Sequence, residues 1–320
     1  MYFGLSEDQV FFQDNVRKFL EDQAPLDAIR KIAEGNDSSS KDELYQGLIN
    51  LGINNLLIPE DNGGLGLDLL FAVAISQSLG AGIATLPFIG PYVMAPIAIK
   101  HAANEMQKNT LFEGMVNNSI NFSIGFSEYF GSRDSSGLTF SQNKVSGKTL
   151  FVLDGDYASH VMLCNKDGQI GVVSLDSVGV ETINLTTVDK TRMYQEMNFD
   201  NTPIEILENS LTSSNAIELS IDAGRIVAAA DSIGASQYMI DKAIEYSKER
   251  KQFNRVIGSF QAVKHMCAEM AADLEPCYSL VWHAAHSFDN HEADSRLMAC
   301  HAKSHVCLLY TSDAADETGR

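Results

Sequence analysis

Residues 222–275 read DAGRIVAAADSIGASQYMIDKAIEYSKERKQFNRVIGSFQAVKHMCAEMAADLE, and this stretch decides the fold. Its apolar residues recur at helical spacing as far as Lys248, which predicts one long helix that Ser213-Ser214-Asn215 caps. A second helix is expected to begin near Ser259. It should kink or break at Pro276, because proline cannot donate an intrahelical hydrogen bond. The stretch therefore predicts two long helices joined by a short turn.

Three patterns follow one another along the chain. Residues 1–117 show helical periodicity, and Ser6 followed by Gln9 opens the first helix like a capping box. Over 118–210, short β-rich runs alternate with Gly, Asp, Asn and Ser, which is the spacing of a small antiparallel barrel or sandwich. Helical periodicity returns over 211–306. We therefore predict an α+β fold with an N-terminal helical domain, a central antiparallel β-barrel or sandwich and a truncated C-terminal helical bundle.

Apolar spacing and turn residues place the individual elements. The polar run at 34–40 is expected to be a loop. Helices are expected at 5–20, 44–51, 68–79, 91–103 and 106–115, with a further one from about Ala293.

Composition limits the kinds of partner. The chain has 320 residues, with 23 Lys and Arg against 42 Asp and Glu and a formal net charge of −19. Phosphate binding needs clustered Lys and Arg, so this balance argues against nucleic acid or an anionic membrane as a partner. No apolar stretch is long enough to span a bilayer, and the N-terminus lacks the pattern of a signal peptide. Because the five cysteines show no CxxC spacing and suit reduced thiols, we expect a cytoplasmic protein without membrane insertion.

The last residues differ in character from those before them. Residues 307–320, CLLYTSDAADETGR, resemble a translated sequencing adapter and break the helical pattern without a capping signal. We expect the natural sequence to stop near Val306, in the middle of an element. The alternative is a genuine frayed tail.

Two motifs resemble the acyl-CoA dehydrogenase family. In that family Arg-x-x-Phe-Gly-x-x-Ile-x-x-x-Gln joins two long helices, and the matching residues here are Arg250, Phe253, Ile257 and Gln261. Asn254 replaces the glycine, and asparagine also tolerates left-handed backbone geometry. Residues 51–80 are similar to the family's Pro-Glu-x-x-Gly-Gly-x-Gly turn and following helix. A tight glycine loop is the alternative for this second motif.

The resemblance implies a cofactor at the first motif. Arg250 and Gln261 would reach the FAD of a neighbouring subunit, with Phe253 packing near it. The chemistry is suitable, because a guanidinium forms paired, charge-assisted hydrogen bonds with pyrophosphate oxygens. The alternative is a solvated arginine at a helix end and a phenylalanine in the core.

The β-rich region matches the family less well. GFSEYFGSRD, residues 125–134, is similar to a family loop that holds flavin and thioester. The resemblance implies cofactor contacts at Phe126 and Ser127, and a substrate contact at Arg133, which stands where the family has serine. Tyr129 replaces a proline of the motif.

A second β-rich segment, residues 147–163, resembles the family's Gly-x-Lys-x-x-Ile-Thr segment. Here Leu150 stands for an aromatic residue, and Val152 stands for the hydroxyl that often contacts the flavin. Backbone amides can still bind flavin atoms, so Val152 remains a candidate cofactor residue. These losses also fit a degenerate subunit of a heteromeric enzyme.

The start of the long helix resembles the substrate region of the family. Asp222 and Arg225 fall where the family places residues beside the bound acyl-CoA. Gly224 occupies the position at which some members carry their catalytic carboxylate. Asp222 has a structural alternative, which is to pair with Arg225 or to favour the N-terminal end of the helix.

The resemblance implies an FAD-dependent oxidoreductase of fatty acid metabolism that converts an acyl-CoA thioester to a 2-enoyl-CoA. Electrons would pass to an electron-transferring flavoprotein, and the protein would form a homo- or hetero-tetramer. The catalytic base is not assigned, because many members carry it in a segment that the resemblance places after Val306. We therefore expect the truncated sequence itself to be inactive. Two alternatives remain: a non-catalytic or half-site subunit, and an acyl-CoA oxidase or flavin monooxygenase on the same fold.

Other residues with chemical potential have structural interpretations. His301 and His305 are four apart, but no carboxylate or third ligand follows at metal-binding spacing, and we predict no metal site. Cys164 and Cys267 fit small buried apolar positions. Tyr278 and Trp282 fit packing positions in the helical bundle.

Overall fold

The computed structural model describes residues 4–35, 38–131, 136–212 and 215–311. The contacts between residues divide the chain into two compact units. The helical unit contains Met1–Leu26, Leu69–Ala84 and Arg225–Arg320, and the sheet unit contains Asp27–Asp68 and Thr85–Gly224. Segments far apart in sequence therefore build each unit. The division into three domains near residues 118 and 211 stays a prediction.

The helical unit is built on a close crossing of α4 (Leu69–Ala81) and α7 (Ala216–Glu249). A Cβ atom added to Gly80 or to Gly234 would collide with a backbone carbonyl oxygen of the other helix. Only glycine allows two helix backbones to approach this closely. The crossing therefore depends on these two positions.

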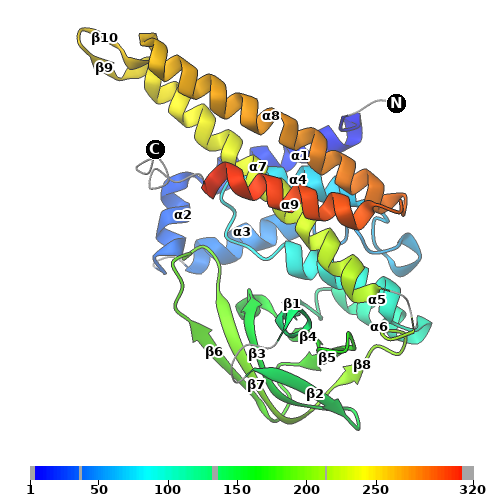
Figure 1. Cartoon of the computed structure of the whole chain (residues 1–320). Helices are drawn as coiled ribbons and strands as arrows, with labels where there is room; N and C mark the ends of the chain where they lie inside the picture. The colour runs from blue at the N-terminus through cyan, green and yellow to red at the C-terminus, as the bar shows by residue number, and fades with distance from the viewer. Residues whose placement is uncertain (1–3, 36–37, 132–135, 213–214, 312–320) are drawn as a thin grey trace. The chain divides into compact units, whose positions relative to one another are not determined.

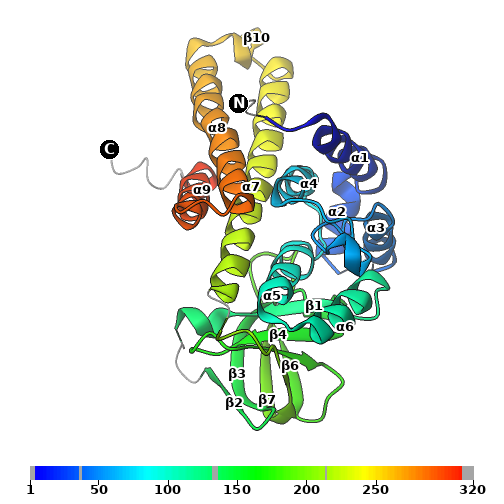
Figure 2. The ribbon, with the colours of Figure 1, turned by 90° about the vertical axis from the view of Figure 1, so that its right-hand side faces the viewer.

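Three more helices complete this unit: α1 (Glu7–Gln23), α8 (Gln261–Asp289) and α9 (Ser295–Thr311). α1 packs against α4, α4 packs against α8, and α8 packs against α9 (Figure 2). α7 and α8 lie side by side as long rods, joined at one end by the strands β9 and β10 (Figure 1). None of the helices in the described ranges is long and apolar enough to cross a lipid bilayer.

The pair of long helices is confirmed, with two differences. α8 passes through Pro276 as one helix, so the proline does not end it. α9 continues beyond Val306 to Thr311, so the break in the helical pattern expected at residue 307 is not seen. The predicted N-cap serines, Ser213 and Ser214, lie outside the described residues.

For the N-terminal helices, one prediction is confirmed and two are wrong. Ser6 and Gln9 form the predicted capping box, with Ser6 N donating to Gln9 Oε1 at 2.8 Å and Gln9 N donating to Ser6 Oγ at 3.2 Å. α2 (Leu26–Ala33) was not predicted. The loop expected at 34–40 is wrong for its last residues, because α3 (Ser38–Asn50) begins there. Serines favour helix starts as well as loops, so the polar run was ambiguous.

The sheet unit combines helices with a single sheet. Besides α2 and α3 it contains η1 (Glu60–Asn62), η2 (Ile89–Met94), α5 (Ala95–Ala102), α6 (Glu105–Val116), η3 (Ser127–Phe130) and η4 (Gly155–Tyr157). The strands are β1 (Phe122–Gly125), β2 (Gly137–Ser141), β3 (Lys144–Leu153), β4 (His160–Cys164), β5 (Ile170–Ser174), β6 (Val180–Leu185), β7 (Tyr194–Pro203) and β8 (Glu205–Ile206). The predicted β-rich region is thus confirmed.

The sheet is mixed, which corrects the expectation of a purely antiparallel barrel or sandwich. Its order is β6-β7-β3-β1-β4-β5-β8, with β2 paired to β3. β1 and β4 are parallel, with Ile124 opposite Met162, while the other described pairs of this sheet are antiparallel. The chain leaves β3 on one side of β1 and returns on the other side as β4. A parallel neighbour needs such a crossover.

Two apolar clusters form the core of the sheet unit. One joins Phe112 of α6 to Phe122 of β1 and to Cys164 of β4. The other lies between strands and includes Val152 and Leu163. Burial raises the pKa of the Cys164 thiol to about 12, which fits a small apolar core residue. Cys267, in contrast, is only partly buried, so the prediction of burial is wrong for it.

A buried ion pair fixes the chain after β3. Arg192 Nη1 lies 2.7 Å from Asp154 Oδ2, with the two side chains 17% and 8% exposed. Arg192 also donates to the carbonyl oxygen of Leu86. Burial raises the pKa of the Asp154 carboxyl group, and the Arg192 guanidinium opposes that rise. The pair links three segments of the sheet unit.

We predict that Arg192→Met lowers the free energy of unfolding by about 3 kcal/mol, because it leaves the Asp154 carboxylate buried without a counter-charge. Adding Asp154→Asn should restore at least about half of this loss, since the remaining groups are neutral. Denaturant unfolding of the single and double variants measures both effects.

The matched control is Arg30→Met. Arg30 pairs with Asp27 at 3.0 Å, but the two side chains are 66% and 86% exposed. Its removal should cost less than about 0.5 kcal/mol. An equal loss in the two arginine variants would contradict the prediction.

Candidate functional site

The first candidate site is the turn between α7 and α8. β9 (Lys251–Gln252) and β10 (Arg255–Val256) form a short hairpin at the end of the two helices (Figure 1). The turn residues Phe253 and Asn254 have φ angles of +52° and +61°. Asn254 therefore adopts the left-handed geometry predicted for it. Phe253 adopts it too, which is costly for a bulky side chain.

The predicted cofactor residues lie exposed around this turn. Phe253 is 87% exposed, so the alternative of a core phenylalanine is wrong. Arg250 and Gln261 are also exposed. Phe260 packs against the turn. Its ring lies 6.2 Å from the ring of Phe253, edge to face, and the centre of the ring lies 3.9 Å from the guanidinium carbon of Arg255. The structure thus gathers Arg250, Phe253 and Gln261 at one tip of the helical unit.

The second candidate site, in the sheet unit, follows the end of β1. Phe126 is buried, with 4% of its surface exposed. Ser127 Oγ donates to the carbonyl oxygen of Leu150 at 2.8 Å, which ties this segment to β3. Ser136 Oγ donates to Glu128 Oε2 at 3.2 Å. The predicted substrate residue Arg133 lies outside the described residues.

β3 contains a bulge beside Ser127. Thr149 is opposite Met197 and Val152 is opposite Gln195, so β3 has one extra residue between the two pairs. The Val152 side chain is fully buried in the apolar cluster between strands. Phe151, at φ +58°, is 44% exposed.

Bulges re-aim side chains and are frequent next to active sites. Phe151 is therefore the aromatic residue presented at the surface of this segment, and sequence reasoning missed it. Leu150, assigned to the aromatic position, is its neighbour. The only signal in the sequence was the aromatic side chain itself, because the register that exposes it depends on pairing with β7.

The third candidate site is the start of α7. Asp222 is 4% exposed and Arg225 is partly buried. Three residues apart on one helix, they are neighbours on its surface. At Gly224, an added Cβ would lie 2.8 Å from the Met94 sulfur, so the space beside this glycine is taken by Met94. Asp222 and Arg225 thus lie within one turn of α7, and position 224 offers no carboxylate.

Within the described ranges, no group of three His, Cys, Asp or Glu side chains is placed to hold a metal ion. His301 and His305 lie on α9, where they border a shallow pocket with Pro276 of α8.

Comparisons with known proteins agree with this architecture. Residues 6–119 match the family model "Acyl-CoA dehydrogenase, N-terminal domain", and residues 214–320 match "Acyl-CoA dehydrogenase, C-terminal domain". Together the matched residues make up more than half of the chain. The chain belongs to the acyl-CoA dehydrogenase family.

Individual relatives are distant. "Probable acyl-CoA dehydrogenase YngJ" of Bacillus subtilis is 25% identical, over 96% of this chain and 87% of its own. "Caffeyl-CoA reductase-Etf complex subunit CarC" of Acetobacterium woodii is also 25% identical, over 99% of this chain and 86% of its own. A chain of the crystal structure of the ChsE4-ChsE5 complex from Mycobacterium tuberculosis superposes with a TM-score of 0.83 at 19% identity, over 97% of this chain and 86% of that one. At this identity the superposition shows the fold.

We predict that Phe253→Asn stabilises the protein by about 1 kcal/mol, because asparagine tolerates positive φ and phenylalanine does not. Thermal unfolding should show a higher midpoint. Phe11→Asn is the control: Phe11 is 65% exposed but lies inside α1, where asparagine is a poorer helix former. A lower midpoint for Phe253→Asn would contradict the prediction.

Proposed function

We propose that this protein is an acyl-CoA dehydrogenase that uses FAD to convert an acyl-CoA thioester to a 2-enoyl-CoA. The observation that carries the proposal is the tip between α7 and α8. At this tip the guanidinium of Arg250, the ring of Phe253 and the amide of Gln261 are all exposed. The N-terminal and C-terminal parts of the same chain match the acyl-CoA dehydrogenase family models. The backbone at Phe253 is strained, and the ring of this residue is exposed. Strain of this kind is frequent at functional sites, which supports a role of the ring in binding.

The residues of the tip fit one part of an FAD molecule. Arg250 would form paired hydrogen bonds with the pyrophosphate, because a guanidinium matches the geometry of phosphate oxygens. Gln261, which lies 3.4 Å from the His265 ring nitrogen, would add a polar contact. Phe253 would pack against the cofactor. Bound FAD supplies a hydride acceptor.

The sheet unit would supply the other part. Phe126 and Ser127 follow the end of β1, and the hydrogen bond from Ser127 to Leu150 brings them next to the bulge at Phe151. Because Ser127 donates its proton to Leu150, its oxygen, 3.3 Å from Thr149 Oγ1, acts as an acceptor. We retain Val152 as a backbone contact only, because its side chain has no exposed surface. The family resemblance, which implies a tetramer, supports a site whose two parts belong to different subunits.

Residues at the start of α7 would bind the substrate. Arg225 would orient the acyl-CoA, and Asp222 would hold the Arg225 side chain in place. Arg133, which lies outside the described residues, would add a further contact. Position 224 cannot supply a base, since Gly224 has no side chain and Met94 takes the space beside it. The base is therefore a residue other than 224.

We propose an electron-transferring flavoprotein as the electron acceptor. One relative is named as a subunit of a complex with such a protein, which supports this assignment. An oxidase or monooxygenase on the same fold would instead pass electrons to O₂.

The test measures FAD binding and turnover of the purified full-length protein with a series of acyl-CoA thioesters. Arg250→Met should weaken FAD binding at least about tenfold, because a charge-assisted hydrogen-bond pair is lost. Enoyl-CoA should form with an electron-transferring flavoprotein as acceptor and not with O₂ alone.

The matched control is Arg30→Met, an exposed arginine on α2 that should leave FAD binding unchanged. If Arg250→Met and the native protein bind FAD with equal affinity, the proposed role of the tip in FAD binding is wrong. Rapid enoyl-CoA formation with O₂ as sole acceptor would favour the oxidase.

A specific observation favours a second candidate, a non-catalytic subunit of a heteromeric dehydrogenase. The buried Val152 side chain cannot replace a flavin-contacting hydroxyl, and Gly224 carries no base. Such a subunit would complete the FAD site of a partner through its tip and bind no FAD in its own sheet unit. Counting FAD per chain in a complex co-purified with the products of neighbouring genes separates the two: one per chain supports the dehydrogenase, and one per two chains supports the half-site subunit.

A further inference from the structure

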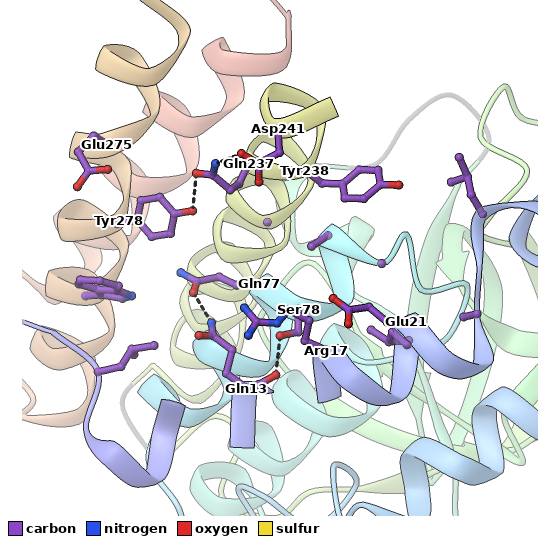
Figure 3. A pocket seen from close by; sticks show the side chains of 18 of the residues that line it. Gln13, Arg17, Glu21, Gln77, Ser78, Gln237, Tyr238, Asp241, Glu275 and Tyr278 are labelled. Carbon is purple, nitrogen blue, oxygen red and sulfur yellow. Dashed lines mark hydrogen bonds between the residues drawn. The ribbon is translucent and has the colours of Figure 1, made fainter. Parts of the chain in front are cut away.

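The helical unit contains a pocket of about 990 Å³, which residues of α1, α4, α7 and α8 line (Figure 3). Hydrogen bonds between lining residues join the helices in pairs. Gln13 Nε2 donates to Gln77 Oε1 at 2.8 Å, and Tyr278 donates its hydroxyl proton to Gln237 Oε1 at 3.2 Å. These polar groups hold α1 to α4 and α8 to α7, so the volume of the pocket alone indicates no ligand.

In the sheet unit, by contrast, two of the candidate sites lie next to each other. Tyr129 of η3 donates its hydroxyl proton to Glu218 Oε1 of α7 at 3.1 Å. The candidate cofactor residues Phe126 and Ser127 belong to the same segment as Tyr129, and Asp222 lies about one turn beyond Glu218 on α7. The hydrogen bond therefore holds the proposed cofactor segment against the start of α7, where the substrate is proposed to bind.

The π-helical turn η2 borders both of these sites. It contacts β1, where a Cβ atom added to Gly90 would lie 3.2 Å from Ile124 Cγ1. It contacts α7 as well, since Ser220 Oγ donates to the carbonyl oxygen of Met94 at 2.8 Å. The Met94 side chain packs against the apolar cluster that contains Phe126. Single π-helical turns are rare and frequently occur at functional sites.

Met94, at the end of η2, faces position 224. Residues 90–93 of this turn are buried, whereas Met94 keeps some exposed surface. A Cβ atom added to Gly224 would lie 2.8 Å from the Met94 sulfur and 3.0 Å from its Cγ. Ser220 and Gly224 are four residues apart and share one face of α7, so the hydrogen bond from Ser220 keeps this face against η2. The Met94 thioether thus fills the space that a side chain at position 224 would need.

The chemistry of the proposed reaction indicates which part of the substrate would lie there. Formation of a 2-enoyl-CoA removes a proton from C2, the carbon next to the thioester carbonyl, so a base must reach C2. By the family resemblance, some members carry this base at the position of Gly224. A substrate bound in the same orientation here would have its C2 carbon beside Met94.

A thioether in contact with C2 limits the width of the acyl group. An unbranched acyl chain carries only hydrogen atoms at C2, whereas a 2-methyl-branched chain needs room for one more carbon. Protein interiors are close-packed, so this carbon competes with the Met94 side chain for the same space. One extra carbon in an apolar pocket changes selectivity by about 10–200-fold.

We propose that Met94 is a specificity-determining residue of the acyl-CoA site, whose thioether packs against C2 of the acyl group and selects unbranched over 2-methyl-branched thioesters. This inference rests on the proposed dehydrogenase function and names the class of acyl group that the site accepts. It adds η2 to the elements that form the substrate site.

The test compares butyryl-CoA with isobutyryl-CoA, isomers whose acyl groups differ in a branch at C2. For the full-length protein we measure kcat/KM for enoyl-CoA formation and, by calorimetry, the dissociation constant of each thioester. The native protein should prefer butyryl-CoA in both measurements. Met94→Ala should shift both preferences toward isobutyryl-CoA at least about tenfold, because it removes the thioether beside C2.

Two further variants separate selectivity from loss of packing. Met94→Leu is the conservative variant and should keep the native preference, because leucine and methionine have similar volumes. Met115→Ala is the matched control: Met115 of α6 is 4% exposed and belongs to the apolar cluster against which Met94 packs. It should lower the midpoint of thermal unfolding and leave the preference between the two thioesters unchanged.

The outcomes separate this proposal from the proposed function. An unchanged preference in Met94→Ala, an equal shift in Met115→Ala, or a native preference for isobutyryl-CoA would overturn the role of Met94 while the dehydrogenase function stands. Binding of the thioesters without enoyl-CoA formation would contradict the dehydrogenase, and the dissociation constants would then decide the role of Met94. If the native protein binds neither thioester, both the substrate site at the start of α7 and the role of Met94 are wrong.

Discussion

The helical unit depends on direct backbone contact between α4 and α7. Gly80 and Gly234 each face a carbonyl oxygen of the other helix, and Ser76 Oγ donates to the carbonyl oxygen of Val227 at 2.9 Å within the same contact. Any larger side chain at the two glycines would separate the helices. The pocket depends on this contact too, because Gly234 and Gln77 both line it.

Features with a local cause could be predicted from the sequence. Helical periodicity predicted α7 and the start of α8 within a few residues, since it records which face of a helix is buried. The turn residues were equally local: Asn254 adopts positive φ because its own side chain tolerates it. The acyl-CoA dehydrogenase family could be identified for the same reason, as its motif lies in one continuous stretch.

Features with a non-local cause could not be predicted. Whether Phe151 or its neighbours face solvent depends on a bulge, and the bulge depends on pairing with a strand more than forty residues away along the chain. A shift of one residue exchanges the two faces of a strand, so Val152 lies in the core and Phe151 at the surface. The parallel pairing of β1 and β4 is likewise a property of the path between strands.

Buried polar groups with and without a hydrogen-bond partner occur in both units. In the sheet unit the Asp154 carboxylate has its counter-charge at 2.7 Å, so the pair is complete and serves to position chain segments. Other buried polar atoms have no partner among the described residues, for example those of Tyr157 and Thr202 in the sheet unit and of Gln77 and Trp282 in the helical unit. Each such donor costs about 1–3 kcal/mol of stability, and apolar residues of similar size would fill the space without that cost. The complete Asp154–Arg192 pair therefore positions chain segments, whereas the unpartnered atoms lower the stability of the units that contain them.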